Sequence, residues 1–235
     1  MLDMPVGNRV FLKRELPSQE LVKAFSELPA ANVADAMGRL CAIHSDIKLM
    51  SSPSKKMCGV ALTVKSRPGD NLLLHKALNL AEEGDVIVVS NEGDRSQSIM
   101  GEIMYKYLSD YKKIEGIVID GPIRDIDVIS KSEMPIYATG TTPGGPYKEG
   151  PGEVNVPIAC GRISVNPGDI ILGDQDGVIV IPKNDAAQIL DKAIAISAGD
   201  AAKAAASASG TVNRNWVDDT LEKKGIEIID DVYRP

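Results

Sequence analysis

The sequence GIVIDGPIRD, residues 116–125, sets the pattern on which the rest of the chain is built. Its consecutive β-branched residues predict a buried strand, and the Gly-Pro pair that follows predicts a turn where the strand ends. A cation and an anion, Arg124 and Asp125, come directly after the turn. Because ligands collect at the carboxyl ends of strands in open α/β proteins, we expect a binding site here.

Arg124 and Asp125 suit different parts of one ligand complex. The guanidinium of an arginine grips a carboxylate through two parallel hydrogen bonds. An aspartate offers hard oxygen atoms to a divalent cation. Together the two side chains would hold an anionic substrate beside a metal ion. The alternative is a solvated ion pair, in which Asp125 only N-caps a helix that begins near Ile126.

Composition and length restrict the class of protein. The 235 residues are enough for one domain with elaborations, and 43% hydrophobic and 25% charged residues are ordinary for a soluble globular protein. A net charge of −7 argues against a general nucleic-acid-binding surface and gives Arg124 more weight as a local positive charge. No apolar run approaches the roughly 18 residues of a membrane span. The first residues, MLDMPVGNRV, lack the pattern of a signal peptide, so we expect a cytoplasmic protein.

Cysteine and histidine usage restricts the kind of metal site. Cys41, Cys58 and Cys160 are widely spaced and form no CxxC motif, which predicts buried thiols rather than a disulfide framework or a zinc cluster. With only His44 and His75, the chain does not favour a histidine-rich metal site or a Ser-His-Asp triad. A metal would therefore have oxygen ligands, which indicates magnesium or manganese.

Hydrophobic periodicity and turn residues predict an alternation of helices and strands. The first helix is capped by Ser18 and places Leu21, Phe25 and Leu28 on one face. Further helices are expected at 32–40 with Asn32 as the cap, 72–80, 101–108, 126–132 and 184–208. Strands are expected at 59–64, 86–89, 117–119, 135–138, 154–158, 161–165, 169–174 and 177–181, the last two as a hairpin. Residues 44–56 are expected to form a surface loop, and residues 139–153 a long irregular loop, of a length that is commonly functional or mobile.

The helix that begins near Gly101 offers a second anion-binding element. Its apolar stripe is predicted to consist of Ile103, Met104, Tyr107 and Leu108. The first turn of a helix has unpaired backbone N–H groups and the positive end of the helix dipole, so a carboxylate docked there would be stabilised. The alternative is that Gly101 is only a small residue that permits close helix packing.

The C-terminal part of the chain buries little of itself. The segment AGDAAKAAASAS, within 184–208, has high helix propensity but few apolar side chains to pack. Residues 211–235 carry the only tryptophan, Trp216. We expect a domain of residues 1–210 and a tail of residues 211–235 that packs across an oligomer.

Several motifs occur together in one order: GVALTV at 59–64, GDVIVV at 84–89, GEIM at 101–104, GIVIDGPIRD at 116–125, and GD at 168–169 with DGVIVIP at 176–182. This combination resembles the RraA-like family, and within it the 4-hydroxy-4-methyl-2-oxoglutarate / 4-carboxy-4-hydroxy-2-oxoadipate aldolases, over roughly residues 30–200. The resemblance implies an α/β fold, a swivelling-type β/β/α domain with a central sheet flanked by helices. It also implies a homotrimer or hexamer with the active site between subunits.

The resemblance implies roles for individual residues. Arg124 matches the family's substrate-binding arginine, and Asp125 matches its metal-binding aspartate. Asp200 is the nearest acidic match to a glutamate that a neighbouring subunit supplies, although it is one methylene shorter. The backbone amides of 101–104 match a cradle for the pyruvyl carboxylate. The expected substrate contacts are therefore Gly101, Glu102, Ile103, Met104 and Arg124.

The implied activity is cleavage of 4-hydroxy-2-oxo acids to pyruvate with a divalent cation, Mg²⁺ or Mn²⁺, together with oxaloacetate decarboxylation. A water oriented by Glu102 or by the neighbouring Asp200 would relay the proton. No lysine is placed to form a Schiff base. Family members of another class bind and inhibit ribonuclease E without catalysis, but they lack the aspartate that follows the arginine, so Asp125 favours the enzyme. A methyltransferase is not supported, because no Gly-rich cofactor loop follows an early strand.

Overall fold

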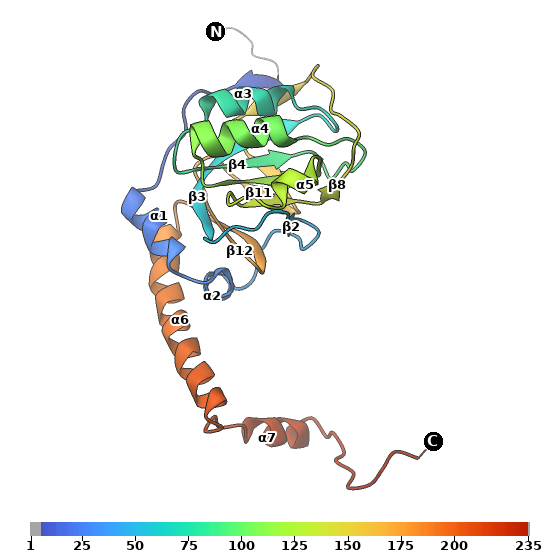
Figure 1. Cartoon of the computed structure of the whole chain (residues 1–235). Helices are drawn as coiled ribbons and strands as arrows, with labels where there is room; N and C mark the ends of the chain where they lie inside the picture. The colour runs from blue at the N-terminus through green and yellow to red at the C-terminus, as the bar shows by residue number, and fades with distance from the viewer. Residues whose placement is uncertain (1–5, 235) are drawn as a thin grey trace. The chain divides into compact units, whose positions relative to one another are not determined.

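A computed structural model describes residues 6–234, and its core is a mixed β-sheet (Figure 1). Within the described residues the sheet has nine strands in the order β1-β9-β3-β4-β5-β7-β2, with β12 paired to β3 and β13 paired to β12. These strands are β1 (Asn8–Val10), β2 (Lys48–Leu49), β3 (Met57–Ser66), β4 (Asp85–Ser90), β5 (Gly116–Asp120), β7 (Ile136–Ala138), β9 (Gly152–Val154), β12 (Ile170–Asp174) and β13 (Gly177–Ile181). The mixed α/β class and the central sheet expected from the sequence are confirmed.

The described residues also form helices and two small sheets (Figure 1). The helices are α1 (Gln19–Ser26), α2 (Ala30–Ala36), α3 (Leu72–Leu80), α4 (Glu102–Lys106) with its π-helical continuation η1 (Tyr107–Lys112), α5 (Ile126–Ile129), α6 (Ala186–Ala208) and α7 (Trp216–Lys223). The small sheets pair β6 (Pro122–Ile123) with β8 (Gly140–Thr141), and β10 (Ile158–Cys160) with β11 (Ile163–Val165).

β5 is the buried strand that the sequence predicted. It pairs in parallel with β4 and β7, and Ile117 stands opposite both Ile87 and Ile136. Ile117, Val118 and Ile119 have no exposed surface, because helices and small strands cover both faces of the sheet. Burial of each such side chain contributes roughly 1.5–3 kcal/mol. The parallel pairing also places the segments that follow β4 and β5 at the same edge of the sheet.

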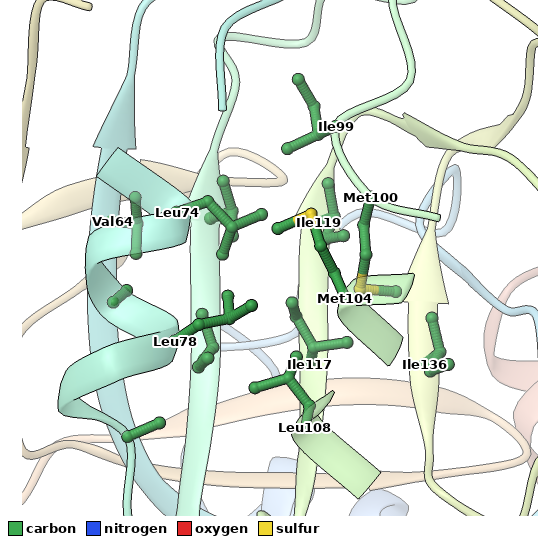
Figure 2. Close-up of a cluster of buried hydrophobic side chains, with 14 of the residues drawn as sticks. Val64, Leu74, Leu78, Ile99, Met100, Met104, Leu108, Ile117, Ile119 and Ile136 are labelled. Atoms are coloured by element: carbon green, nitrogen blue, oxygen red, sulfur yellow. The ribbon is translucent and has the colours of Figure 1, made fainter. Parts of the chain in front are cut away.

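Separate clusters of apolar side chains cover the faces of the sheet. Figure 2 shows Leu74 and Leu78 of α3 and Met104 of α4 packed over Ile117 and Ile119. Val118 points to the opposite face, into a cluster with Met57, Tyr137 and residues of β10 and β11. A third cluster joins α1 and α2 to β12 and β13 through Phe25, Val33 and Leu172.

The α1 prediction is confirmed, and the helix predicted after Pro29 is present as α2, but its predicted cap at Asn32 and its predicted end at Leu40 are wrong. The Ser18 hydroxyl accepts a hydrogen bond from Leu21 N at 3.3 Å and caps α1. Helix α2 ends at Ala36 and starts at Ala30, so Asn32 lies inside it rather than at its cap. A carboxylate from far along the chain stabilises its first turn instead, since Asp174 Oδ2 accepts from Ala30 N at 2.9 Å.

Other boundaries differ where a distant partner determines the structure. The expected loop 44–56 contains β2, which pairs with β7. The expected loop 139–153 contains β8 and most of β9, and the expected strand 154–158 is replaced by the end of β9 and the start of β10. Helix α5 stops at Ile129 rather than at residue 132. The β12–β13 hairpin is confirmed, with Asp174 paired to Gly177.

The chain divides into two compact units within α6. The first unit ends at Ile196 and the second begins at Ser197, earlier than the boundary after residue 210 that the sequence predicted. In the described part of the second unit no residue is buried, and Trp216 is 63% exposed. Among the described residues, no helix has the length and apolar character needed to cross a membrane.

Candidate active site

Arg124 and Asp125 lie side by side just beyond the carboxyl end of β5. The Arg124 Nε and Asp125 Oδ2 atoms are 3.6 Å apart, and the side chains are 42% and 41% exposed. That separation is an ion pair rather than a good hydrogen bond. A short ladder fixes the backbone here, since Ile99 N donates to Pro122 O and Arg124 N donates to Met100 O, both at 2.9 Å. The ladder carries the segment that follows β4 alongside the segment that follows β5.

Asp125 does not play the capping role that the alternative interpretation gave it. It occupies the N-cap position of α5, with a left-handed backbone (φ 58°, ψ 40°), but its side chain makes no capping hydrogen bond there. Its Oδ2 atom instead accepts from Glu102 N, the first residue of α4, at 2.9 Å. Aspartate is one of the few residues that tolerate this backbone conformation. The carboxylate is therefore directed across to α4 and the positive end of its dipole.

Gly101 allows this close approach. Its backbone is extended (φ −143°, ψ −169°), a conformation open to any residue. A Cβ atom at this position would lie 2.5 Å from Asp125 Oδ2 and 3.0 Å from Arg124 Cγ and Nε. The glycine thus permits close packing, as one interpretation proposed, but against Arg124 and Asp125 rather than against a helix.

The predicted amide cradle at 101–104 is altered by this arrangement. The Glu102 amide already donates to Asp125, so in this structure a carboxylate of the protein itself occupies part of the cradle. The Glu102 side chain pairs with Lys106 Nζ at 2.5 Å, one turn along α4. That hydrogen bond raises the pKa of Lys106.

Ile103 and Met104 differ sharply in environment. Met104 is 7% exposed and packs in the main apolar cluster, as predicted. The prediction that Ile103 belongs to the same buried stripe is wrong, because its exposure is 84%. Ile103 therefore presents an apolar surface next to Glu102 rather than to the core.

A glycine-rich loop contacts Arg124 on another side. A Cβ atom at Gly145 would lie 3.2 Å from Arg124 Nη1. Ser98 N and Oγ donate to Gly144 O at 2.8 and 2.6 Å and hold this loop. The sequence marked residues 139–153 only as a long irregular loop. The Gly144-Gly145 pair could have indicated that the backbone of this loop comes close to another part of the site.

Asp125 supplies the carboxylate oxygens through which this site would bind a hydrated cation. Within the described residues, no group of three or more histidine, cysteine, aspartate or glutamate side chains is arranged to hold a metal. A half-exposed carboxylate beside Arg124 fits Mg²⁺, which keeps several waters and accepts substrate oxygens. A cavity of about 1080 Å³ lies elsewhere, and Arg14, Cys58 and Asp85 are among its lining residues.

Asp200 lies in the second compact unit, on α6. Its carboxylate is 3.0 Å from Lys203 Nζ of the same helix. The role expected for it requires a neighbouring subunit and stays a prediction.

The family of the chain follows from comparison with known proteins. A model of the RraA-like family, described as Aldolase/RraA, matches residues 30–180. The chain belongs to the RraA-like family. A relative from Halalkalibacterium halodurans, named "Putative 4-hydroxy-4-methyl-2-oxoglutarate aldolase", is 39% identical over 187 residues, which cover 78% of this chain and 87% of the relative.

Solved structures agree with this assignment to the RraA-like family. A protein from Pseudomonas syringae matches with a TM-score of 0.74 and 26% identity, covering 85% of this chain and 97% of that one. Streptomyces coelicolor RraAS2, described as an unusual member of the RNase ES inhibitor RraA protein family, matches with a TM-score of 0.70 and 30% identity, covering 77% and 94%. Relatives in this family are thus named both as aldolases and as inhibitors of RNA processing.

Proposed function

We propose that this protein is a divalent-metal-dependent aldolase that releases pyruvate from 4-hydroxy-2-oxo acids of the 4-hydroxy-4-methyl-2-oxoglutarate type. The observation that carries the proposal is the exposed Arg124–Asp125 pair at the carboxyl end of β5, packed over Gly101. The names of the relatives support the same class of reaction. The carboxylate-gripping arginine favours a 2-oxo acid as the ligand.

Arg124 would bind the carboxylate of the pyruvyl end. Its guanidinium can present two parallel donors to the two oxygens of a carboxylate, and such charge-assisted pairs are about twice as strong as neutral ones. Gly145 and Gly101 present backbone rather than side chains to Arg124 on two sides. This backbone would help to orient the guanidinium and the acid bound to it before reaction.

Asp125 would hold the cation, Mg²⁺ or Mn²⁺, together with water and substrate oxygens. When bound, the cation supplies Lewis-acid polarisation of the 2-oxo group. Asp125 itself is kept in place by the Glu102 amide and by its own left-handed backbone. Oxaloacetate is the second proposed substrate, because loss of its carboxylate as CO₂ leaves the same enolate of pyruvate as the aldol cleavage.

Proton transfer to the product carbon needs an acid near Asp125. Glu102, at the start of α4, is one proposed group, acting through a water molecule. Asp200 of a neighbouring copy is the other. The second proposal requires a homotrimer or hexamer, and it is supported by the absence of buried residues in the described part of the second unit.

Pyruvate release from 4-hydroxy-4-methyl-2-oxoglutarate and from oxaloacetate tests this function in wild type and in Arg124→Lys. Lysine keeps the charge but cannot form the bidentate pair, so kcat/KM should fall for both substrates by about 2 kcal/mol in transition-state free energy. Arg39→Lys is the control, since Arg39 is exposed and pairs only with Asp35 one turn away among the described contacts. No turnover by wild type would favour the inhibitor class, and binding to ribonuclease E would then be measured.

A further inference from the structure

Asp70 is a buried carboxylate that, within residues 6–234, is held by backbone amides alone. It lies just beyond β3 and is 1% exposed. Its Oδ1 atom accepts from Leu72 N at 2.9 Å, and its Oδ2 atom accepts from Glu149 N at 2.7 Å and from Gly150 N at 2.9 Å. Among the described residues no cation forms a salt bridge with it. A buried carboxylate that holds amides from two separate segments ties those segments together.

The second of these segments is the glycine-rich loop that contacts Arg124. At its start, Thr142 N donates to Ile123 O at 3.0 Å, and Gly144 O accepts from Ser98. Near its end, Tyr147 N donates to Gly69 O at 2.9 Å, and Tyr147 O accepts from Asn71 N at 3.0 Å.

The residues around Asp70 therefore anchor the loop in its second half. Tyr147 is bound by the neighbours of Asp70, and Glu149 and Gly150 are bound by its carboxylate. Gly145 lies between these anchors and the Ser98 anchor, against Arg124 Nη1.

The same turn also fixes the other side of the site. Asn71 is buried, and its Nδ2 donates to Ile99 O at 2.9 Å, two residues before Gly101. Gly69 N donates to Asn91 Oδ1 at 2.9 Å, in the segment that follows β4. Residues 69–71 thus hold both backbone segments that contact the Arg124 side chain, and Asp70 holds the loop side.

We infer that Asp70 is a positioning residue for the Arg124 guanidinium. Its carboxylate fixes the loop at Glu149 and Gly150, the loop places the Gly145 backbone against Arg124, and that backbone limits where the guanidinium can stand. This inference rests on the proposed function, in which Arg124 grips the carboxylate of the substrate. Asp70 itself touches neither the substrate nor Arg124 in this scheme.

Asp70→Asn is the direct test, because it keeps the shape of the side chain. A carboxamide has one acceptor oxygen, so its NH₂ group would face either the Leu72 amide or both the Glu149 and Gly150 amides, and the amides that face it lose their acceptor. We expect KM for oxaloacetate to rise about tenfold while kcat stays within about twofold. The reason is that the substitution would weaken binding of the substrate and of the transition state equally. In an Arg124→Lys background the same substitution should raise KM no further.

Asp169→Asn is the matched control. Asp169 is also buried, at 3% exposure, and it also accepts from backbone amides, those of Asn166 at 2.8 Å and Lys183 at 3.1 Å. It lines a cavity whose lining residues include none of the proposed site. Its substitution should lower the melting temperature as Asp70→Asn does, but leave KM unchanged.

A second variant keeps the test valid if Asp70→Asn fails to fold. Gly145→Ala introduces a methyl group 3.2 Å from Arg124 Nη1 at a position without a left-handed backbone, so it acts on the same contact from the loop side. It should raise KM in the same direction. An unchanged KM in both variants, with normal turnover by wild type, would overturn the positioning role and leave the proposed function standing.

Failure of the proposed function gives a different result. If wild type releases no pyruvate from either substrate, calorimetric titration with pyruvate measures the anion site without turnover. A dissociation constant about tenfold weaker in Asp70→Asn than in wild type and Asp169→Asn would support the positioning role. Equal constants, or no pyruvate binding by wild type, would overturn it.

Discussion

The backbone amide of Glu102 donates a 2.9 Å hydrogen bond to the carboxylate of Asp125, and so joins the start of α4 to the turn after β5. The bond holds the aspartate on the same side as Arg124, 3.6 Å from its Nε atom. The positive end of the helix dipole therefore already stabilises the protein's own carboxylate, that of Asp125. The proposed cation would therefore meet an aspartate that is fixed in advance.

Removal of divalent cations should abolish pyruvate release, and Asp125→Asn should reproduce that loss. Asparagine can still accept from the Glu102 amide and tolerates a left-handed backbone, whereas alanine would add strain at φ 58°. We expect a fall in kcat of roughly 100-fold or more. Full activity after exhaustive EDTA treatment would contradict the metal mechanism.

The control for this experiment is Asp127→Asn. Asp127 is an exposed aspartate on the same short helix, α5. Its substitution removes one negative charge nearby without touching Glu102 or Arg124. Kinetics should match wild type, and similar losses in both variants would point to general electrostatics instead.

Gly101→Ala should damage the site while the fold survives. The added Cβ atom would lie 2.5 Å from Asp125 Oδ2, so Asp125 or the ladder beside it must move. Overpacking of this kind costs about 1–3 kcal/mol, and we expect kcat/KM to fall about 10- to 100-fold. Steady-state kinetics and thermal melting, measured together, separate the effect on the site from a general loss of stability.

The second compact unit predicts an oligomer in solution. Its exposed apolar side chains include Trp216, Ile228 and Ile229, at 63%, 72% and 67% exposure. Such side chains contribute to stability only when another surface covers them. Sedimentation at micromolar concentration should give a trimer or hexamer, weakened by Trp216→Ala, and a lone 25.1 kDa species would refute it.

Stability should decline at alkaline pH through buried acidic groups. Burial raises the pKa of the Cys58 thiol to about 12 from 9.0, and it raises those of Cys160 and Tyr137 as well. The unfolded chain releases these protons at lower pH, so the contribution of Cys58 is complete below about 9 and is lost as pH rises towards about 12. Melting temperatures should fall as the pH rises from about 9 towards about 12, and Cys58→Ala should flatten the decline.

Local patterns in the sequence predict the strands and miss the contacts between loops. The apolar run at 117–119 and the turn at Asp174–Gly177 are short-range signals, and both are confirmed. The start of α2 depends on Asp174, and β2 depends on β7, so a partner far along the chain determines each. The hydrogen bonds from Glu149 N and Gly150 N to Asp70 likewise join positions about 80 residues apart, and no spacing rule reveals them.

The sequence predicted only part of the candidate site correctly. The Arg-Asp pair after a strand end is a local signal, and the structure places it at an exposed edge. Ile103 was misplaced because periodicity gives a stripe without saying which side of the helix the sheet covers. Met104 and Leu108 lie four positions apart and face the core, whereas Ile103 is rotated away by about 100°.

Strand β3 has consequences for the order in which the chain can fold. One edge pairs with β4, close in sequence, but the other edge pairs with β9 through Val64–Ser66 and with β12 through Met57–Val60. During synthesis that second edge stays open until residues beyond Gly173 have left the ribosome. Non-local pairing of this kind slows folding, and an open edge invites association with other chains. A nascent chain of this protein should therefore depend on chaperones until its last strands emerge.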